Sequence, residues 1–166
     1  MLIEKLKARF PADVLSAEES HGEEMIVVSR DRAPDMLLAL RDESEFAFDM
    51  LVDVTCVDWP QRTPRFQVVY HLHSLSLHHR LRIKIEVAEQ DAWVHSAIGI
   101  WKGADWLERE CYDMFGIHFE GHPDLRRILM YDSFEGHPLR KDYPATRRQP
   151  VVAETDPVLT PLRPSR

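Results

Sequence analysis

With 166 residues, 44% of them hydrophobic, the chain has the size and composition of a single globular domain. It contains two cysteines, no apolar run approaching about 18 residues and no secretory signal at its N-terminus, which predicts a soluble intracellular protein without a disulfide framework. The net charge is −7, and its distribution argues against a nucleic-acid-binding domain: residues 1–125 carry 13 Lys/Arg against 23 Asp/Glu, whereas residues 126–166 carry 8 against 5. An acidic body with a basic tail fits instead a tail that docks on an acidic protein surface.

Hydrophobic periodicity predicts two helices and four strands in the N-terminal half of the chain. The expected elements are a helix over 2–10, a strand over 23–29, a helix over 32–44 and strands over 50–59, 65–73 and 80–87. The last two strands alternate apolar and polar residues, so we expect a hairpin with one buried and one solvent-facing side. The order of elements predicts an α+β fold, with helices packed on one face of a small, mostly antiparallel sheet and a long extended C-terminal tail after it.

Residues 105–115 have the clearest local signals for a third helix. Asp105 is expected to cap its N-terminus, and Glu108, three residues later, to complete a capping box. Gly116 is expected to end the helix as its C-terminal cap. The apolar stripe that would face the core comprises Leu107, Cys111, Met114 and Phe115.

From Gly116 onward the sequence shows no regular period, so we divide the chain into three parts. Residues 1–116 are expected to form the α+β domain, 117–144 an irregular segment packed on the domain and on a partner, and 145–166 an extended proline-rich tail. The tail has almost nothing that could form a core. If it is ordered, it must lie along another surface.

The pentapeptide Phe-Glu-Gly-His-Pro occurs twice, at Phe119–Pro123 and at Phe134–Pro138. In each copy the histidine follows glycine and precedes proline, which places it at a turn. His122 and His137 could be metal ligands, or the two copies could be structural clamps in which Phe is an anchor and the basic pair that follows reaches a carboxylate. The clamp is the favoured interpretation, because both histidines lie on irregular chain without the rigid support that a metal site needs.

Four further histidines, His71, His73, His78 and His79, raise the question of a zinc site. Zinc requires three or four convergent ligands. His71 and His73 lie on the strand side opposite the apolar residues, where exposed polar side chains are expected. The favoured interpretation is therefore an ordinary solvent-facing side of a strand.

Acid–base catalysis by the carboxylates of the third helix finds no support in their spacing. Glu108 and Glu110 are two residues apart and do not face each other on a helix. Arg109 and Asp113, four residues apart, are expected to pair with each other. Because phosphate-binding and dinucleotide-binding glycine motifs are also missing, we predict no catalytic, cofactor-binding or metal-binding residue in this chain.

The stretch of residues 108–144 resembles the thirty-kilodalton (C) subunit family of the bacterial NADH:quinone oxidoreductase, respiratory complex I. The family signature is matched with every interval kept by Glu108, Arg109, Glu110, Asp113, Met114, Phe115, His122, Arg126, Ile128 and Leu129. The closing sequence GHPLRKDYP over 136–144 and the hairpin over 65–87 also look like the family. The resemblance is strong over roughly 50–144 and weak in the tail.

This resemblance implies an accessory subunit without chemistry of its own. In such enzymes electrons pass from NADH through FMN and iron–sulfur clusters to quinone, coupled to proton pumping, and other subunits carry these cofactors. The thirty-kilodalton subunit is implied to lie in the peripheral arm on the cytoplasmic side of the bacterial inner membrane. It would pack against the quinone-site (D) subunit and neighbouring iron–sulfur subunits, and would meet the membrane only through the complex.

The interface with those partners is expected in the signature helix and the two clamps. The expected interface residues are Glu108, Arg109, Glu110, Asp113, Phe119, His122, Arg126, Arg127, Phe134, His137, Arg140, Lys141, Asp142 and Tyr143. Two alternatives remain: the equivalent subunit of a membrane-bound nickel–iron hydrogenase complex, or a free-standing metalloenzyme. The latter would use His71, His73, His122 or His137.

Overall fold

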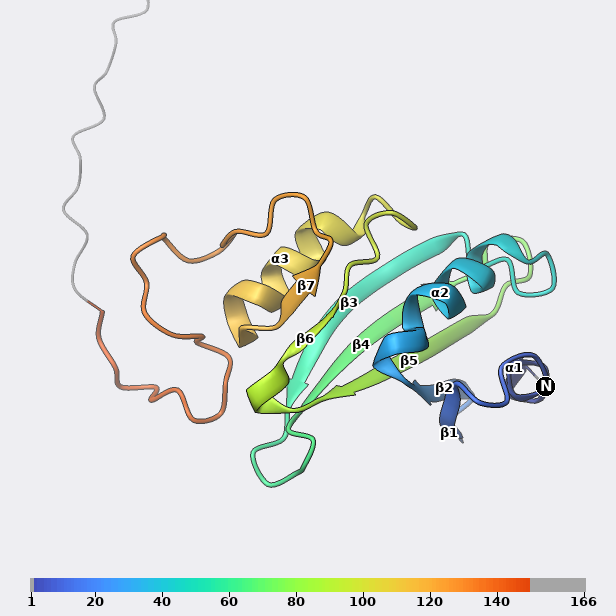
Figure 1. The fold of residues 1–166 in the computed structure, drawn as a ribbon, viewed down its shortest axis with the longest axis horizontal. Coiled ribbons are helices and arrows are strands. Elements are labelled where there is room, and N and C mark those ends of the chain that lie inside the picture. Colours follow the sequence, from blue (N-terminus) through green and yellow to red (C-terminus); the bar gives the residue numbers. More distant parts are fainter. Residues whose placement is uncertain (1, 150–166) are drawn as a thin grey trace, which may run out of the picture.

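A computed structural model describes residues 2–149, which are built around a five-stranded sheet (Figure 1). In spatial order the strands are β1 (Val14–Ser20), β2 (Glu23–Val28), β5 (Arg80–Val87), β4 (Phe66–His73) and β3 (Met50–Asp58). Neighbouring strands are antiparallel except β2 and β5, which run parallel. The predicted α+β fold with a mostly antiparallel sheet is confirmed.

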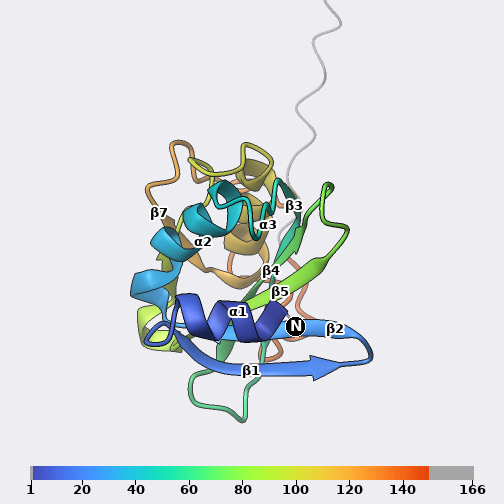
Figure 2. The ribbon, with the colours of Figure 1, turned by 90° about the vertical axis from the view of Figure 1, so that its right-hand side faces the viewer.

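Three α-helices and two short 3-10 helices accompany the strands (Figures 1 and 2). They are α1 (Leu2–Arg9), η1 (Arg30–Arg32), α2 (Ala33–Asp42), η2 (Glu89–Asp91) and α3 (Ala104–Phe115). The apolar sides of α1, α2 and α3 all join one core cluster with the same face of the sheet, as the amphipathic spacing predicted. Within residues 2–149 no helix combines the length and the apolar composition that crossing a bilayer requires.

The hairpin of β4 and β5 presents its apolar residues to this core. The opposite face was expected to be exposed to solvent. This expectation is wrong for Gln67 and Val69 of β4, which are both buried. Val69 is paired across the sheet with Lys84, whose long side chain can cover it. Gln67 is bonded on both sides, accepting from the Trp59 indole and donating to Glu86. A central strand is therefore shielded even where no helix covers it.

Two three-residue strands flank α3 and fix its position. β6 (Trp93–His95) and β7 (His118–Glu120) pair in parallel, and α3 lies between them in the chain. The expectation of no regular structure after Gly116 is wrong at β7, because a strand of three residues is too short to show a periodic pattern. β1 was also missed. Of the predicted extended tail, residues 150–166 lie outside the described residues.

Candidate functional site

The site is built on α3, which runs beside β3 (Figure 1). Gly103 is the N-cap residue and makes no side-chain capping bond, so the expected cap by Asp105 is wrong. Asp105 lies inside the first turn. At the other end, Gly116 has a left-handed backbone with φ 75°, and its N–H donates to Tyr112, which confirms the predicted C-terminal cap.

Glu108 is fully buried and does not form the expected capping box. Its carboxylate accepts hydrogen bonds from the Ser96 hydroxyl and the Ala97 N–H, both at 2.6 Å. Burial raises the pKa of Glu108, although these two hydrogen bonds act in the opposite direction. The side chain therefore fastens the chain just after β6 to the middle of α3.

Arg109 does not pair with Asp113, contrary to the expected i, i+4 ion pair. Its guanidinium donates to the carbonyl oxygens of Arg126 and Arg127, at 3.2 and 3.1 Å. Carbonyl oxygens of irregular chain have no helical partners, and a planar guanidinium can serve two of them at once. Arg109 thus holds the segment that follows β7 against α3.

Asp113 is the centre of the arrangement. Its buried carboxylate accepts from Arg127 at 2.6 Å and from three successive backbone N–H groups, those of Ile128, Leu129 and Met130, at 3.1, 2.8 and 2.8 Å. Burial alone would raise the pKa of Asp113, but these four donors outweigh it and the pKa is lowered. A single carboxylate on a helix therefore organises a stretch of chain that forms no helix or strand.

The first Phe-Glu-Gly-His-Pro copy anchors at the start of α3. Phe119 belongs to the core, and Gly121 turns the chain with φ 84°. The His122 side chain is fully buried. Its Nδ1 accepts from the Asp124 N–H at 3.1 Å, so Nε2 carries the proton and donates to the Asp105 carbonyl oxygen at 3.2 Å.

The second copy anchors at the end of α3. Gly136 again turns the chain, with φ 90°. His137 donates through Nδ1 to the Asp113 carbonyl oxygen at 2.9 Å, and burial is the main reason that its pKa is lowered. Phe134 is only half-buried and stacks on Tyr143, with ring centroids 6.0 Å apart.

The two copies therefore share the glycine turn and the use of a histidine as a donor to α3, but not the same anchor. One holds the first turn of the helix and the other holds the last. Arg127 ties the second copy to α3, because it binds Asp113 and also donates to the Gly136 carbonyl oxygen at 3.1 Å.

The chain beyond His137 is tied to the end of the sheet. Arg140 donates to the Phe115 carbonyl oxygen at 2.6 Å, and the Lys141 N–H donates to the buried carboxylate of Asp58 at 2.7 Å. Arg65 binds Asp58 through two nitrogens and also reaches Asp142 at 3.0 Å. The hydrogen bonds from Arg65 are the main reason that the pKa of Asp58 is lowered.

Of the expected interface residues, three are buried and the rest lie at or near the surface. Glu108, Asp113 and Phe119 are buried. The exposed ones are Glu110, Arg126, Lys141 and Asp142, and the half-buried ones are Arg109, Arg127, Phe134, His137, Arg140 and Tyr143. The backbone of His122 is partly exposed, whereas its side chain is buried. Their role at an interface remains a prediction. Those whose polar groups bind α3 or the end of the sheet have a structural role within the chain itself.

Sequence reasoning missed Asp58, Arg65 and Ser96 as members of this site. Asp58 ends an apolar strand just before Trp59 and Pro60. A carboxylate in that position could have indicated a site residue. Arg65 and Ser96 carry no signal in the sequence, because their roles depend on contacts made across the fold.

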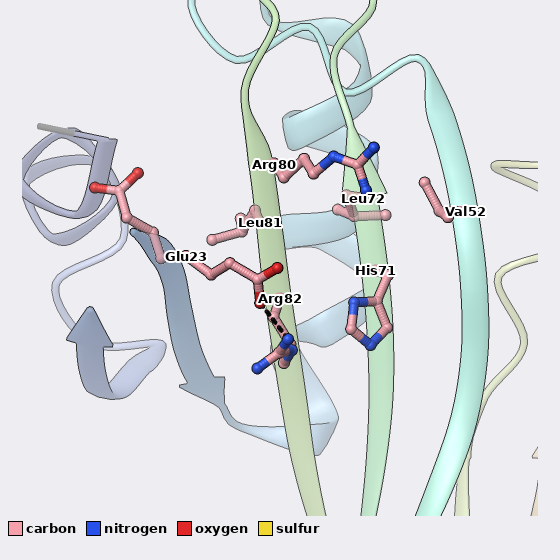
Figure 3. A pocket seen from close by; sticks show the side chains of 8 residues that line it. Glu23, Val52, His71, Leu72, Arg80, Leu81 and Arg82 are labelled. Atoms are coloured by element: carbon pink, nitrogen blue, oxygen red, sulfur yellow. Dashed lines mark hydrogen bonds and ion pairs between the residues drawn. The ribbon is translucent and has the colours of Figure 1, made fainter. Parts of the chain in front are cut away.

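Two further observations concern the alternative of a metal or cofactor site. Among residues 2–149, no three His, Cys, Asp or Glu side chains are placed to hold a metal ion. A pocket of about 50 Å³ on the uncovered face of the sheet contains His71 and the Glu23–Arg82 ion pair (Figure 3). That volume is sufficient for a few water molecules but not for a flavin or a quinone.

Comparison with known proteins identifies one family. Residues 26–149 match the family model described as the 30 Kd subunit of the respiratory-chain NADH dehydrogenase. The (C) subunit of the NADH-quinone oxidoreductase of Citrifermentans bemidjiense is 49% identical over 84% of this chain and 86% of its own length. That of Rhizobium rhizogenes is 51% identical over 80% of this chain and 66% of its own length.

Two solved structures share this fold. A trypsin-resistant fragment of Nqo5 superposes with a TM-score of 0.65 and 32% identity, covering 75% of this chain and all of the fragment. A chain of the membrane-bound sulfane sulfur reductase, an archaeal respiratory membrane complex, gives a TM-score of 0.74 over 87% of this chain and 85% of its own. At 23% identity that second likeness shows a common fold alone. The resemblance inferred from the signature over 108–144 is confirmed.

Proposed function

The chain belongs to the family of the 30 kDa subunit of the respiratory-chain NADH dehydrogenase, and we propose that it acts there as a non-catalytic docking subunit. In this role it belongs to the peripheral arm of an NADH-quinone oxidoreductase on the cytoplasmic side of the inner membrane. FMN and the iron–sulfur clusters are carried by other subunits. Its partners are the quinone-site (D) subunit and the neighbouring iron–sulfur subunits.

One observation carries the non-catalytic part of the proposal: apart from the exposed Glu110, the titratable signature groups are engaged in holding the chain to itself. Asp113 is saturated by four donors, Glu108 by two, and His137 is bonded to the helix backbone. A general acid or base needs a reachable proton and a place for substrate beside it. The signature instead gives an irregular segment a fixed path, which is what a protein-binding surface requires.

Replacing Asp113 by asparagine tests this proposal. The matched control is Asp132→Asn, because Asp132 lies on the same segment, is exposed and enters no ion pair within residues 2–149. We expect Asp113→Asn to reduce the amount of assembled NADH-quinone oxidoreductase in the membrane while the turnover of each assembled complex stays unchanged. The control should alter neither quantity.

Full assembly with lost turnover would overturn the proposal and assign Asp113 a direct chemical role. Copurification of the tagged wild-type chain with a complex that lacks an NADH-binding subunit would also overturn it. That result would favour a related complex of the hydrogenase or sulfur-reductase kind.

A further inference from the structure

The helix α3 has three sides, and residues 2–149 cover only two of them. Its inner side, with Cys111, Met114 and Phe115, packs on the sheet. A second side, with Arg109 and Asp113, holds the segment that follows β7. The third side remains open.

Trp106 and Glu110 occupy this open side, one helical turn apart. Trp106 is 68% exposed, the most exposed large hydrophobic side chain in residues 2–149. Burying an indole releases a large apolar area from water, so an exposed tryptophan on a well-packed helix is a candidate for an interface. Loop mobility does not explain its position, because both ends of α3 are clamped by His122 and His137.

The neighbouring edge strand extends the apolar surface. Val52 and Met50 of β3 are 40% and 43% exposed, although both belong to a strand. The pairing of β3 with β4 shifts register between Leu51 and Asp53, which leaves Val52 out of the ladder. Together with Trp106 and Leu107, Val52 and Leu51 line a groove of about 460 Å³ between β3 and the start of α3.

Two free charges bracket this groove. Lys102 lines it just before α3, and Glu110 lies one turn beyond Trp106. Asp105 also lines the groove, but its carboxylate lies 3.3 Å from His122 Nε2. Neither Lys102 nor Glu110 takes part in an ion pair within the described part of the chain, whereas most charged residues of the neighbouring segment do. An apolar centre between two unpaired charges of opposite sign is typical of a protein–protein interface with a polar rim.

From these observations we propose that the open side of α3 and the edge of β3 dock an apolar segment of a neighbouring protein subunit. This inference rests on the proposed function and adds the location of the contact. The partner would insert a bulky apolar side chain between Trp106 and Val52, with a basic group facing Glu110 and an acidic group facing Lys102. A membrane surface fits less well, because the chain carries a net charge of −7 and the groove includes a single lysine.

Copurification of the tagged chain with the NADH-quinone oxidoreductase tests the contact. We expect Trp106→Ser, and separately Glu110→Lys, to reduce recovery of the partner subunits by roughly tenfold or more. Leu15→Ser is the matched control, since Leu15 is 64% exposed on β1, far from α3 in the sheet order, and should retain wild-type recovery. Both altered positions are exposed, so the thermal unfolding midpoint should stay at the wild-type value; the Glu110→Lys variant keeps the test valid if the serine variant unfolds.

A photoreactive benzoylphenylalanine in place of Trp106 should crosslink to one subunit of the oxidoreductase, and the same residue in place of Leu15 should not. Wild-type recovery with both variants would overturn the inference while leaving the proposed function intact. If the unaltered chain fails to recover the oxidoreductase subunits, the proposed function itself fails. Trp106-dependent binding to phosphatidylglycerol vesicles, or a Trp106-dependent dimer in sedimentation, would assign the groove to a membrane or to a second copy and would also overturn the inference.

Discussion

In the sheet and the helices packed on it, the buried side chains are almost all apolar, whereas residues 120–149 are held mainly by hydrogen bonds and ion pairs. The first region is stabilised by the burial of apolar side chains, and this stabilisation does not depend on exact bond directions because the hydrophobic effect is not directional. The second depends on a few donors and acceptors at fixed positions, above all Asp113 and Asp58. The family signature therefore encodes attachment points for a chain with almost no core of its own.

The largest expected difference in stability is between substitutions of the phenylalanine in the two pentapeptide copies. Phe119→Ala removes a fully buried ring from the core and should lower the free energy of unfolding by about 4 kcal/mol. Phe134→Ala removes a half-buried ring that contacts only the side chains of its own segment, Tyr131, Tyr143 and Arg127, and should lower it by about 1 kcal/mol. Urea unfolding followed by far-UV circular dichroism measures both values; equal losses would mean that the copies are equivalent anchors.

Asp113→Ala should break the second region without breaking the first. It removes the carboxylate to which Arg127 and three backbone N–H groups donate, a loss of about 3 kcal/mol in the attachment of the segment. We therefore expect rapid proteolytic cleavage within residues 124–142 and a trypsin-resistant core that still contains the sheet. Cleavage at the wild-type rate would show that the segment is held by other contacts.

Gly116→Ala should have an intermediate effect at the junction of the two regions. A Cβ at this position would lie 2.5 Å from His137 Nε2, and the backbone φ of 75° is unfavourable for alanine. We expect a loss of about 2 kcal/mol in thermal or urea unfolding. Gly99→Ala is the control, because nothing lies within 4 Å of its added Cβ and its φ is not positive, so it should remain near the wild-type stability.

The smallest effect should appear with pH. The folded-state pKa of His137 lies below the ordinary 6.5, so below that pH the unfolded state binds more protons and stability falls with falling pH. Between roughly pH 7 and pH 5 we expect a small loss of stability that His137→Gln reduces, while His71, whose pKa burial also lowers, contributes in the same direction. Asp113 and Asp58, whose pKa values are lowered, stabilise the fold above about pH 4 and lose that contribution in stronger acid. A pH profile identical in wild type and His137→Gln would exclude the histidine as the cause.

The sequence predicts the sheet and its helices better than it predicts the contacts that hold residues 120–149. The strands β2 to β5 and the three helices have hydrophobic periods long enough to be recognised, and the resemblance identified the family from the signature. The partners of Glu108, Arg109 and Asp113 could not be predicted, because local rules assign helix residues to caps and i, i+4 pairs. Their actual partners are mostly backbone groups 11 to 18 residues away, which carry no side-chain signature in the sequence.

The most direct test of this attachment is hydrogen exchange at three amides, those of Ile128, Leu129 and Met130. They lie outside every helix and strand, yet each donates to the buried Asp113 carboxylate. In the wild-type chain these amides should exchange at least about a hundredfold more slowly than those of an unstructured peptide. In Asp113→Ala their exchange rate should rise sharply, while the amides of β4 and β5 keep their protection. Exchange at the unstructured rate in the wild-type chain would show that the Asp113 carboxylate does not hold this segment.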